Sequence, residues 1–285
     1  TAVFGPVAMA YVADLAPVRR GERMGLFSSA TLIGRSLAPL AGGFLLALGF
    51  RAVYVCCGIA GIIALAIAWA LPRPEHTPSV DRADLREALR EAGQGLRQTV
   101  RNPAILCASG AEAVVYLCFG AVETFLPLYA MAHGIPEWQI GIIFAAQITT
   151  VAVTKPLLGG ASDRLGRVPV IGAGLMVSAG SLVALSLLSG VWGLGVAAAV
   201  FGLALSAVTS ATSAFVSDAS RARHYGAALG VLSTIMDVGH STGPVLAGAL
   251  IGALSYRSTF RIIAVLPVAM AIVLLLAVRS SSVRE

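Results

Sequence analysis

Nine long apolar runs, separated by mostly short polar loops, constrain how this chain can fold more than any other feature. The runs cover residues 1–16, 24–50, 52–71, 104–132, 138–160, 168–190, 191–216, 226–250 and 258–278. A bilayer core about 30 Å thick needs about 20 apolar residues per helix. Only 12% of the 285 residues are charged, whereas soluble domains average about 25%. We therefore expect an all-α integral membrane protein with about nine transmembrane helices, partnered by the lipid bilayer.

The distribution of arginine predicts how these helices are oriented. If the loop 17–23 is cytoplasmic and the chain then alternates sides, fifteen arginines lie in cytoplasmic loops and only Arg51 and Arg257 lie outside. Basic residues accumulate on the cytoplasmic side of membrane proteins. We expect a plasma (cell inner) membrane location with a cytoplasmic C-terminus. The net charge of +6 belongs to these loops and does not indicate nucleic-acid binding.

An internal repeat links the first part of the chain to the last. Residues of the first stretch recur 204 to 206 positions later, with offset changes only in polar loops: Asp14 as Asp218, Gly34 as Gly239, Pro39 as Pro244, Gly43 as Gly248 and Arg51 as Arg257. The repeated runs 24–50 and 226–250 are six spans apart, and an even number of crossings makes them parallel. Such repeats are typical of transporters whose two halves are related by an axis along the membrane normal.

The segment 72–103 differs from the rest of the chain and is interpreted as a linker between two halves. Pro72, Pro74 and Pro78 end the preceding helix. Residues 81–101 predict an amphipathic helix on the cytoplasmic membrane surface or under the two halves. The expected organisation is thus the C-terminal part of an N-terminal six-helix half (1–71), the linker (72–103) and a C-terminal six-helix half (104–285).

The stretch Gly159-Gly160-Ala161-Ser162-Asp163-Arg164-Leu165-Gly166-Arg167 joins two runs on the expected cytoplasmic side. It resembles the signature loop of the major facilitator superfamily, Gly-x-x-x-Asp-Arg-x-Gly-Arg, and the resemblance covers essentially the whole chain. It implies that the nine runs are the fourth to twelfth helices of a twelve-helix transporter. Because the chain begins without Met, inside an apolar run, we expect it to lack the N-terminal helices. The implied mechanism is alternating access around a small-molecule site, by rocking of two halves.

Charged residues near this loop are candidates for a gate. Asp163 ends one helix beside Arg164, Gly166 and Arg167, and Asp218 ends another helix on the same side. An Asp–Arg–Asp cluster can hold the cytoplasmic side closed and break when that side opens. The alternative is a static surface ion pair worth about 0–1 kcal/mol. Asp14 would take the part of Asp218 in the other half.

A second motif, Gly25-(x)8-Gly34-(x)3-Ala38-Pro39-(x)2-Gly42-Gly43, resembles the antiporter motif of drug- and metabolite-exporting members of the superfamily. Ala38 replaces one glycine of that motif. Gly34, Ala38 and Gly42 form a small-residue stripe that lets another helix approach closely, and Pro39 bends the helix. The resemblance implies export in exchange for protons. Helix packing alone also explains the glycines.

Polar residues inside apolar runs are candidates for a proton and substrate pathway, since a charge in the membrane is costly and faces protein or water. Arg35 and His240 occupy equivalent positions of the repeat, and Asp237 precedes His240 by three residues. Glu112 and Glu123 are eleven residues apart, about three helical turns, so both carboxylates are expected on one face. Tyr116 and Phe119 lie near that face. The full candidate set is Glu112, Glu123, Asp237, His240, Arg35, Tyr116, Phe119 and Gln147, with Ser206, Thr209 and Ser210 as weaker candidates.

We hypothesise that Glu112, Glu123 and Asp237 include a carboxylate that takes up and releases a proton during transport. Arg35 and His240 could orient the substrate or act as counter-charges. They could equally form hydrogen bonds between helices beside the glycine stripes, and Glu123 could simply be solvated near the outer end. Lys155, near the cytoplasmic end of its run, is expected to reach the headgroups.

The leading hypothesis is a secondary active transporter, a proton-coupled exporter of small organic molecules. The alternatives are a proton symporter that imports a nutrient and a non-transporting membrane sensor of the same fold. No enzymatic activity, cofactor or metal is expected, and we expect a monomer. The stretch Gly239-His240-Ser241-Thr242-Gly243 matches the hydrolase pattern Gly-x-Ser-x-Gly, but that pattern requires a strand-to-helix turn. Here it lies inside an apolar run.

Overall fold

The computed structural model describes residues 20–70, 90, 93, 103–219 and 225–282. The run 1–16, Asp14 and nearly all of the linker 72–103 lie outside the described residues, so the expectations for them remain predictions. The backbone of residue 35 is described as helical, but its side chain is not. Nothing further is therefore said of the contacts of Arg35.

Every secondary-structure element in the described part of the chain is a helix. Their bounds are α2 Arg20–Ala47, α3 Phe50–Ala70, α5 Pro103–Ala132, α6 Glu137–Leu165, α7 Arg167–Leu187, α8 Val191–Ala219, α9 Tyr225–Ala253, α10 Tyr256–Ile263 and α11 Val265–Ser282. The expected all-α fold is thereby confirmed. Six spans among the described residues are long and apolar enough to cross a membrane: α3, α5, α6, α7, α8 and the α10–α11 segment. The total of nine crossings remains a prediction.

The last apolar run differs from the single helix that the sequence predicts. It is broken at Ala264, between α10 and α11. Pro267 follows three residues later and has no N–H to donate to the carbonyl of Ile263, four residues earlier. The missing hydrogen bond accounts for a break at this point in the run.

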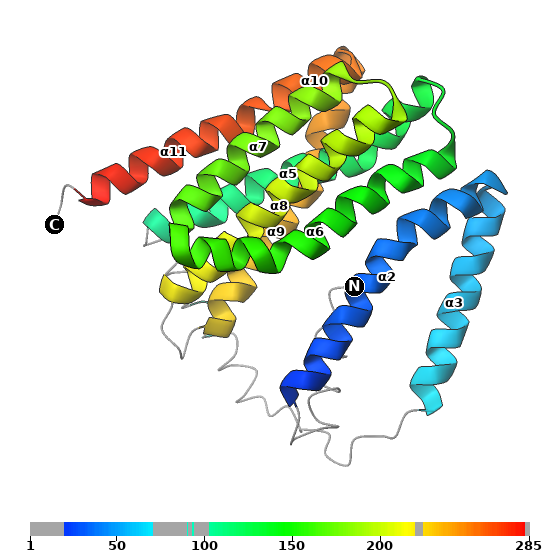
Figure 1. The fold of residues 1–285 in the computed structure, drawn as a ribbon, viewed down its shortest axis with the longest axis horizontal. Helices are drawn as coiled ribbons and strands as arrows, with labels where there is room; N and C mark the ends of the chain where they lie inside the picture. Colours follow the sequence, from blue (N-terminus) through cyan, green and yellow to red (C-terminus); the bar gives the residue numbers. More distant parts are fainter. Residues whose placement is uncertain (1–19, 71–89, 91–92, 94–102, 220–224, 283–285) are drawn as a thin grey trace.

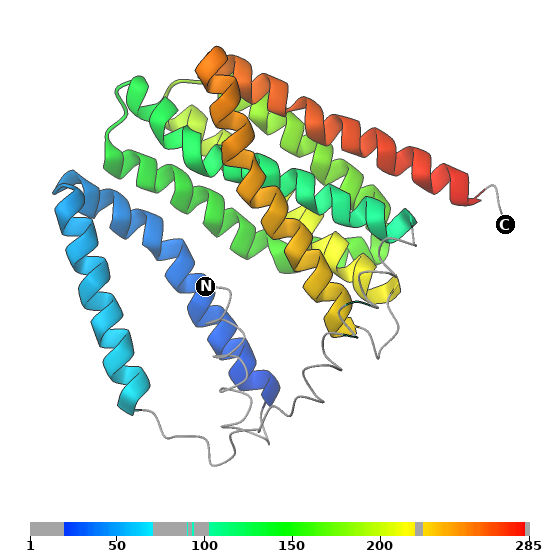
Figure 2. The ribbon, with the colours of Figure 1, turned by 180° about the vertical axis from the view of Figure 1, so that it is seen from behind.

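Helices α5 to α11 pack side by side into a bundle, and α2 and α3 form a hairpin along one side of it (Figures 1 and 2). The closest associations in the bundle are between α6 and α8 and between α5 and α9. Its core includes the fully buried side chains of Tyr129, Phe201 and Phe260. Helix α2 packs against α6, whereas α3 is outermost and has no buried residues.

The second copy of the repeated glycine motif brings α9 against α5. A Cβ added to Gly239 would overlap the carbonyl oxygen of Ala113, and one added to Gly243 would overlap that of Leu117. From the other side, a Cβ on Gly120 would overlap the carbonyl oxygen of His240. The small-residue stripe therefore works in this copy as the sequence predicts, by letting two helix backbones meet.

In the first copy of the motif, on α2, the described helix contact is made by a different face of the helix. A Cβ on Gly34 or Gly42 would meet no described atom within 4 Å. Pro39 and Gly43 contact α6 instead, since a Cβ on Gly141 would lie 2.5 Å from the carbonyl oxygen of Pro39 and 3.2 Å from the Cα of Gly43. The expectation that Gly34 and Gly42 contact another helix therefore has no counterpart among the described residues.

The turn between α6 and α7 consists of one residue, Gly166. Its φ of +92° lies in the left-handed region, which side chains with a Cβ rarely adopt. The turn brings Asp163 in the last turn of α6 close to Arg167 at the start of α7. This explains physically why the signature loop needs a glycine at this position.

Candidate functional site

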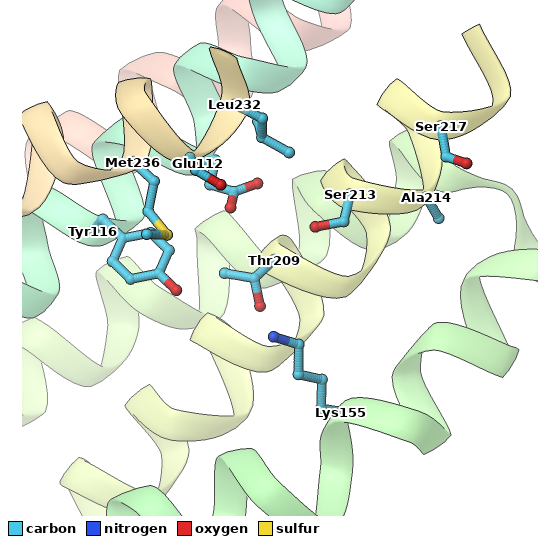
Figure 3. Close-up of a pocket in the computed structure, with 10 residues that line it drawn as sticks. Glu112, Tyr116, Lys155, Thr209, Ser213, Ala214, Ser217, Leu232 and Met236 are labelled. Atoms are coloured by element: carbon cyan, nitrogen blue, oxygen red, sulfur yellow. The ribbon is translucent and has the colours of Figure 1, made fainter. Parts of the chain in front are cut away.

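A cavity of about 740 Å³ lies within the bundle, near the end where α5 and α9 begin and α6 and α8 end (Figure 3). Four helices contribute to its walls. The described residues that line it are Glu112, Tyr116, Lys155, Thr209, Ser213, Ala214, Ser217, Leu232, Ser233 and Met236. A volume of this size is typical of small-molecule sites.

Glu112 is the carboxylate of this cavity. It projects from α5 and is only 4% exposed, and the hydroxyl of Thr212 on α8 donates a hydrogen bond to its Oε2. Thr212 is the one side-chain donor to this carboxylate among the described residues, and acceptor positions remain there for a ligand or a proton. The structure thus places Glu112 on the wall of a cavity, next to a hydroxyl of the neighbouring helix.

Lys155 lies on α6 across the cavity from Glu112. Its ammonium group points into the cavity, toward Thr209 and Ser213 of α8 (Figure 3). Among the ion pairs of the described residues, none within 4.0 Å joins these two charges. The sequence predicts that Lys155 reaches the headgroups; in the structure its side chain is exposed and lines the cavity.

A second cluster of side chains, outside the cavity lining, joins α5 and α9. Nε2 of His240 lies 2.8 Å from Oε2 of Glu123, and the His240 ring stacks on Phe119 with centroids 5.3 Å apart. Tyr116 belongs to both the cavity lining and this cluster. It lines the cavity, and its ring lies edge-on to His240 and Phe119. The predicted pathway residues thus fall into two sets that meet at Tyr116.

Two further candidates, Asp237 and Gln147, are not among the described lining residues of the cavity. Asp237 is exposed and is not among the described lining residues. Gln147 is fully buried between α6 and α8, and its amide has no hydrogen-bond partner among the described residues. Its backbone contacts Gly202, where an added Cβ would lie 2.5 Å from the Gln147 carbonyl oxygen. These two residues are therefore not brought together with Glu112.

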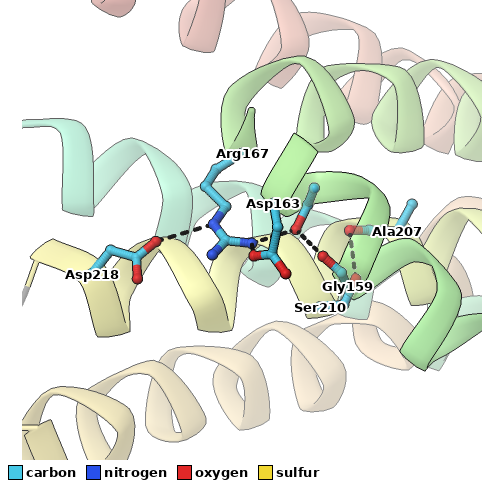
Figure 4. A network of polar contacts seen from close by, with 7 residues as sticks. Gly159, Asp163, Arg167, Ala207, Ser210 and Asp218 are labelled. Carbon is cyan, nitrogen blue, oxygen red and sulfur yellow. Dashed lines mark hydrogen bonds and ion pairs between the residues drawn. The ribbon is translucent and has the colours of Figure 1, made fainter. Parts of the chain in front are cut away.

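Arg167 is the centre of the predicted charged cluster (Figure 4). It forms an ion pair with Asp163, and its Nε donates to Oδ2 of Asp218 at 3.1 Å. Its Nη1 also donates to the Ser162 hydroxyl at 2.6 Å. Arg164 is exposed and makes no ion pair with described residues. The cluster ties together the ends of α6, α7 and α8, which all belong to the same bundle.

Metal binding, thiol chemistry and hydrolysis would each need a particular arrangement among the described residues. No group of three His, Cys, Asp or Glu side chains there could hold a metal ion. The four cysteines, Cys56, Cys57, Cys107 and Cys118, are free. Gly239 and Gly243 of the hydrolase-like stretch lie within α9, pressed against α5, rather than in a strand-to-helix turn.

An all-helical bundle with several membrane-spanning segments and a charged internal cavity defines an integral membrane protein of the transporter type. Residues 1–146 and 111–285 match the model of the Major Facilitator Superfamily. The chain belongs to this superfamily of membrane transporters.

Relatives and solved structures agree with this membership. The chain is 25% identical over 277 residues to an uncharacterized MFS-type transporter of Methanocaldococcus jannaschii, covering 94% of this chain and 69% of that protein. It is 24% identical over 289 residues to the multidrug resistance protein MdtG of Dickeya zeae, covering 99% and 69%. With MdtG of Proteus mirabilis the identity is 24% over 264 residues, covering 90% and 64%. The chain therefore spans about two thirds of the length of these relatives.

The fold is similar to that of a bacterial homologue of the human lysosomal transporter Spinster, crystallised in an inward-facing and occupied conformation. The TM-score is 0.77 at 19% sequence identity, over 96% of this chain and 73% of that one. At this identity the similarity concerns the fold.

Sequence reasoning missed several residues of the cavity. Lys155, Ser213 and Ser217 line the cavity but are not among the predicted pathway residues, and Thr209 is only a weaker candidate. Thr212, which binds Glu112 without lining the cavity, is not predicted either. Two signals were present. Lys155 is the only lysine of the chain, and Thr209, Ser213 and Ser217 recur at four-residue spacing, which places them on one face of a helix.

Proposed function

We propose that the protein is a proton-coupled exporter of small organic molecules that works by alternating access. The observation that carries this proposal is the cavity with the buried carboxylate of Glu112 on its wall. A buried ionisable residue inside a membrane protein is by default a candidate for function. The similarity to proteins named multidrug resistance protein MdtG favours export over import.

The proposal includes an arrangement in two halves. Residues 104–285 form one six-helix half, residues 1–71 belong to the other, and 72–103 connect them. The end of the bundle that carries Arg167 and Asp218 faces the cytoplasm, with the C-terminus on that side of the cell inner membrane. The cavity lies toward the same end, so this conformation corresponds to one that is accessible from the cytoplasm. The protein acts as a monomer.

Glu112 carries the coupling proton in this scheme. A substrate that enters from the cytoplasm displaces the proton from Glu112, and a proton from the other side displaces the substrate after the halves have rocked. Thr212 holds the carboxylate in place through its hydrogen bond. The Glu123–His240 pair, in contact with Tyr116 through the imidazole ring, is the next proton-binding group along the α5–α9 interface. It can pass protons to or from the outer side.

The Arg167 cluster has a proposed gating role, for which a matched pair of variants provides a test. Arg167 contacts Asp163 and Asp218, whereas Arg164 contacts neither. The Arg167→Gln variant is expected to lose most transport, because the ends of α6 and α8 are no longer held together when the halves rock. Its unfolding free energy should fall by no more than about 1 kcal/mol, since the aspartates are more than half exposed.

Arg164→Gln is the control for that variant, and it should keep both transport and stability. Substrate flux in proteoliposomes and thermal unfolding of the purified protein measure the two properties. If Arg167→Gln transports at the wild-type rate, the cluster is a static ion pair and the gating role is wrong.

The direction of transport can be measured in everted membrane vesicles. A panel of cationic, anionic, zwitterionic and neutral fluorescent amphiphiles serves as probes. Acidifying the vesicle interior should drive accumulation of the probe that the protein transports. A protonophore should release the accumulated probe. Depletion of the probe under the same gradient would indicate an importing symporter. Failure of every probe to respond, relative to vesicles without the protein, would contradict the proposed function and favour a sensor.

A further inference from the structure

The cavity contains two opposite charges that are held apart. Among its described lining residues only Glu112 and Lys155 are charged, and they come from different helices, α5 and α6. Among the described residues they form no ion pair within 4.0 Å, although both line the same cavity (Figure 3). Lys155 is also the single lysine among 20 basic residues. Glu112 is buried, and a buried charge in a membrane protein is costly, whereas Lys155 is exposed on the cavity wall and open to a ligand. A ligand with both charges would pair with both residues.

The surroundings of Lys155 suit an acidic group. Thr209, Ser213 and Ser217 line the cavity from one face of α8, and the Lys155 ammonium points toward the first two of these (Figure 3). An ammonium group and hydroxyl groups together provide several hydrogen-bond donors around one position. Such a set of donors matches the oxygen atoms of a carboxylate or sulfonate.

The surroundings of Glu112 suit an ammonium group with an apolar neighbour. Thr212 occupies one acceptor position of the carboxylate, and a carboxylate has about four such positions. Tyr116, Leu232 and Met236 line the cavity on this side. An aromatic ring and a flexible thioether can adapt to the apolar body of different molecules.

We propose that the cavity binds zwitterionic organic molecules, with the acidic group at Lys155 and the ammonium group at Glu112. This inference rests on the function proposed above and names its substrate class. A purely anionic ligand would face the Glu112 carboxylate, and a purely cationic one would face Lys155, so each would lose part of its attraction. A zwitterion matches both charges. Its ammonium group also competes with the proton for Glu112, as exchange with protons requires.

Four dansyl probes of nearly equal size differ only in their charged groups, so they measure how much each charge contributes to binding. Nα-dansyl-lysine carries a carboxylate and an ammonium group, Nα-dansyl-norleucine only the carboxylate, dansylcadaverine only the ammonium group, and N-pentyl dansylamide neither. Dissociation constants are measured by dansyl fluorescence with the purified protein in nanodiscs. Nα-dansyl-lysine should bind tightest, and removal of either charge should weaken binding about tenfold or more.

Two variants assign each charge of the probe to its residue. Lys155→Met should weaken Nα-dansyl-lysine and Nα-dansyl-norleucine about tenfold without weakening dansylcadaverine, whose binding then also reports a folded cavity. Lys155→Arg keeps the positive charge and should retain most of the probe affinity that Lys155→Met loses. Glu112→Gln should show the opposite pattern, in which the ammonium probes weaken and Nα-dansyl-norleucine does not. Equal losses for all probes, a preference for a singly charged probe, or absence of Nα-dansyl-lysine binding would each overturn the proposal.

These experiments distinguish a failure of the proposed ligand class from a failure of the proposed transport function. If Nα-dansyl-lysine shows the expected charge pattern but no probe is carried across vesicles, the ligand class stands and the transport function is wrong. If other probes are transported under a proton gradient while the charge pattern is absent, export stands and the zwitterion site is wrong.

Discussion

Replacing Glu112 with glutamine is expected to abolish proton-driven accumulation of substrate while leaving the fold intact. The amide keeps an oxygen that can accept the Thr212 hydrogen bond, but it cannot bind and release a proton. A proton moving through a potential of about 100 mV supplies about 2.3 kcal/mol, enough for about 50-fold accumulation of a substrate exchanged one for one. The variant should lose that accumulation in everted vesicles and retain some passive substrate exchange in the absence of a gradient, at a rate lowered by its weaker binding of the ammonium group.

Three further variants serve as controls for this result. Glu112→Asp keeps a carboxylate and should retain part of the driven transport. Glu137→Gln makes the same chemical change in the first turn of α6, outside the described cavity lining, and should transport normally. Asp237→Asn alters an exposed carboxylate outside the described cavity lining and should have a smaller effect than Glu112→Gln. Undiminished proton-driven transport by Glu112→Gln would remove this residue from the coupling mechanism.

The largest loss of stability is expected at the α5–α9 contact. In Gly243→Ala the new Cβ would overlap the carbonyl oxygen of Leu117, and backbone atoms cannot move aside as the end of a flexible side chain can. The two helices must separate, and overpacking of this kind costs about 1–3 kcal/mol. Thermal unfolding of the purified protein, measured at one detergent concentration, should show a clearly lower midpoint.

A glycine on the same helix provides the control. A Cβ added to Gly230 would meet no described atom within 4 Å, and alanine is favoured over glycine inside a helix by about 1 kcal/mol. Gly230→Ala should therefore be neutral or slightly stabilising. A wild-type unfolding midpoint for Gly243→Ala would show that α5 and α9 do not pack as closely as the structure places them.

The apolar runs predict the helices well because the bilayer leaves a spanning segment few alternatives to a helix. The run 104–132 becomes α5, Pro103–Ala132, and the run 191–216 becomes α8, Val191–Ala219. The break at Ala264 is harder to predict. Pro39, Pro127, Pro156 and Pro244 all lie inside continuous helices, so a proline alone does not determine whether a helix is interrupted.

The candidate site could be predicted only in part. Glu112 stands out because a carboxylate inside an apolar run needs a polar environment. Lys155 does not stand out, since a lysine near a helix end can reach the headgroups, and only the packing of α6 against α8 shows that it points inward. Glu112 and Glu123, expected on one face, contact different helices through Thr212 and His240. Their neighbours, which the helical periodicity does not identify, determine what each carboxylate does.

The charged cluster illustrates the same limit. Arg164 directly follows Asp163 in the sequence and Arg167 is four residues away, yet among the described ion pairs it is Arg167 that binds Asp163 and Asp218. The left-handed turn at Gly166 determines this choice, because it reverses the chain so that Arg167 starts the next helix beside the end of α6.

Proton release on ligand binding tests the central claim most directly. Nα-dansyl-lysine is added to purified protein in weakly buffered solution with a pH indicator, at a series of values from mildly acidic to mildly alkaline. If the ammonium group replaces a proton on Glu112, the wild-type protein releases protons over part of this range and Glu112→Gln releases none. Proton uptake on binding, or equal release by the wild-type protein and by Glu112→Gln, would contradict exchange of substrate for a proton at Glu112.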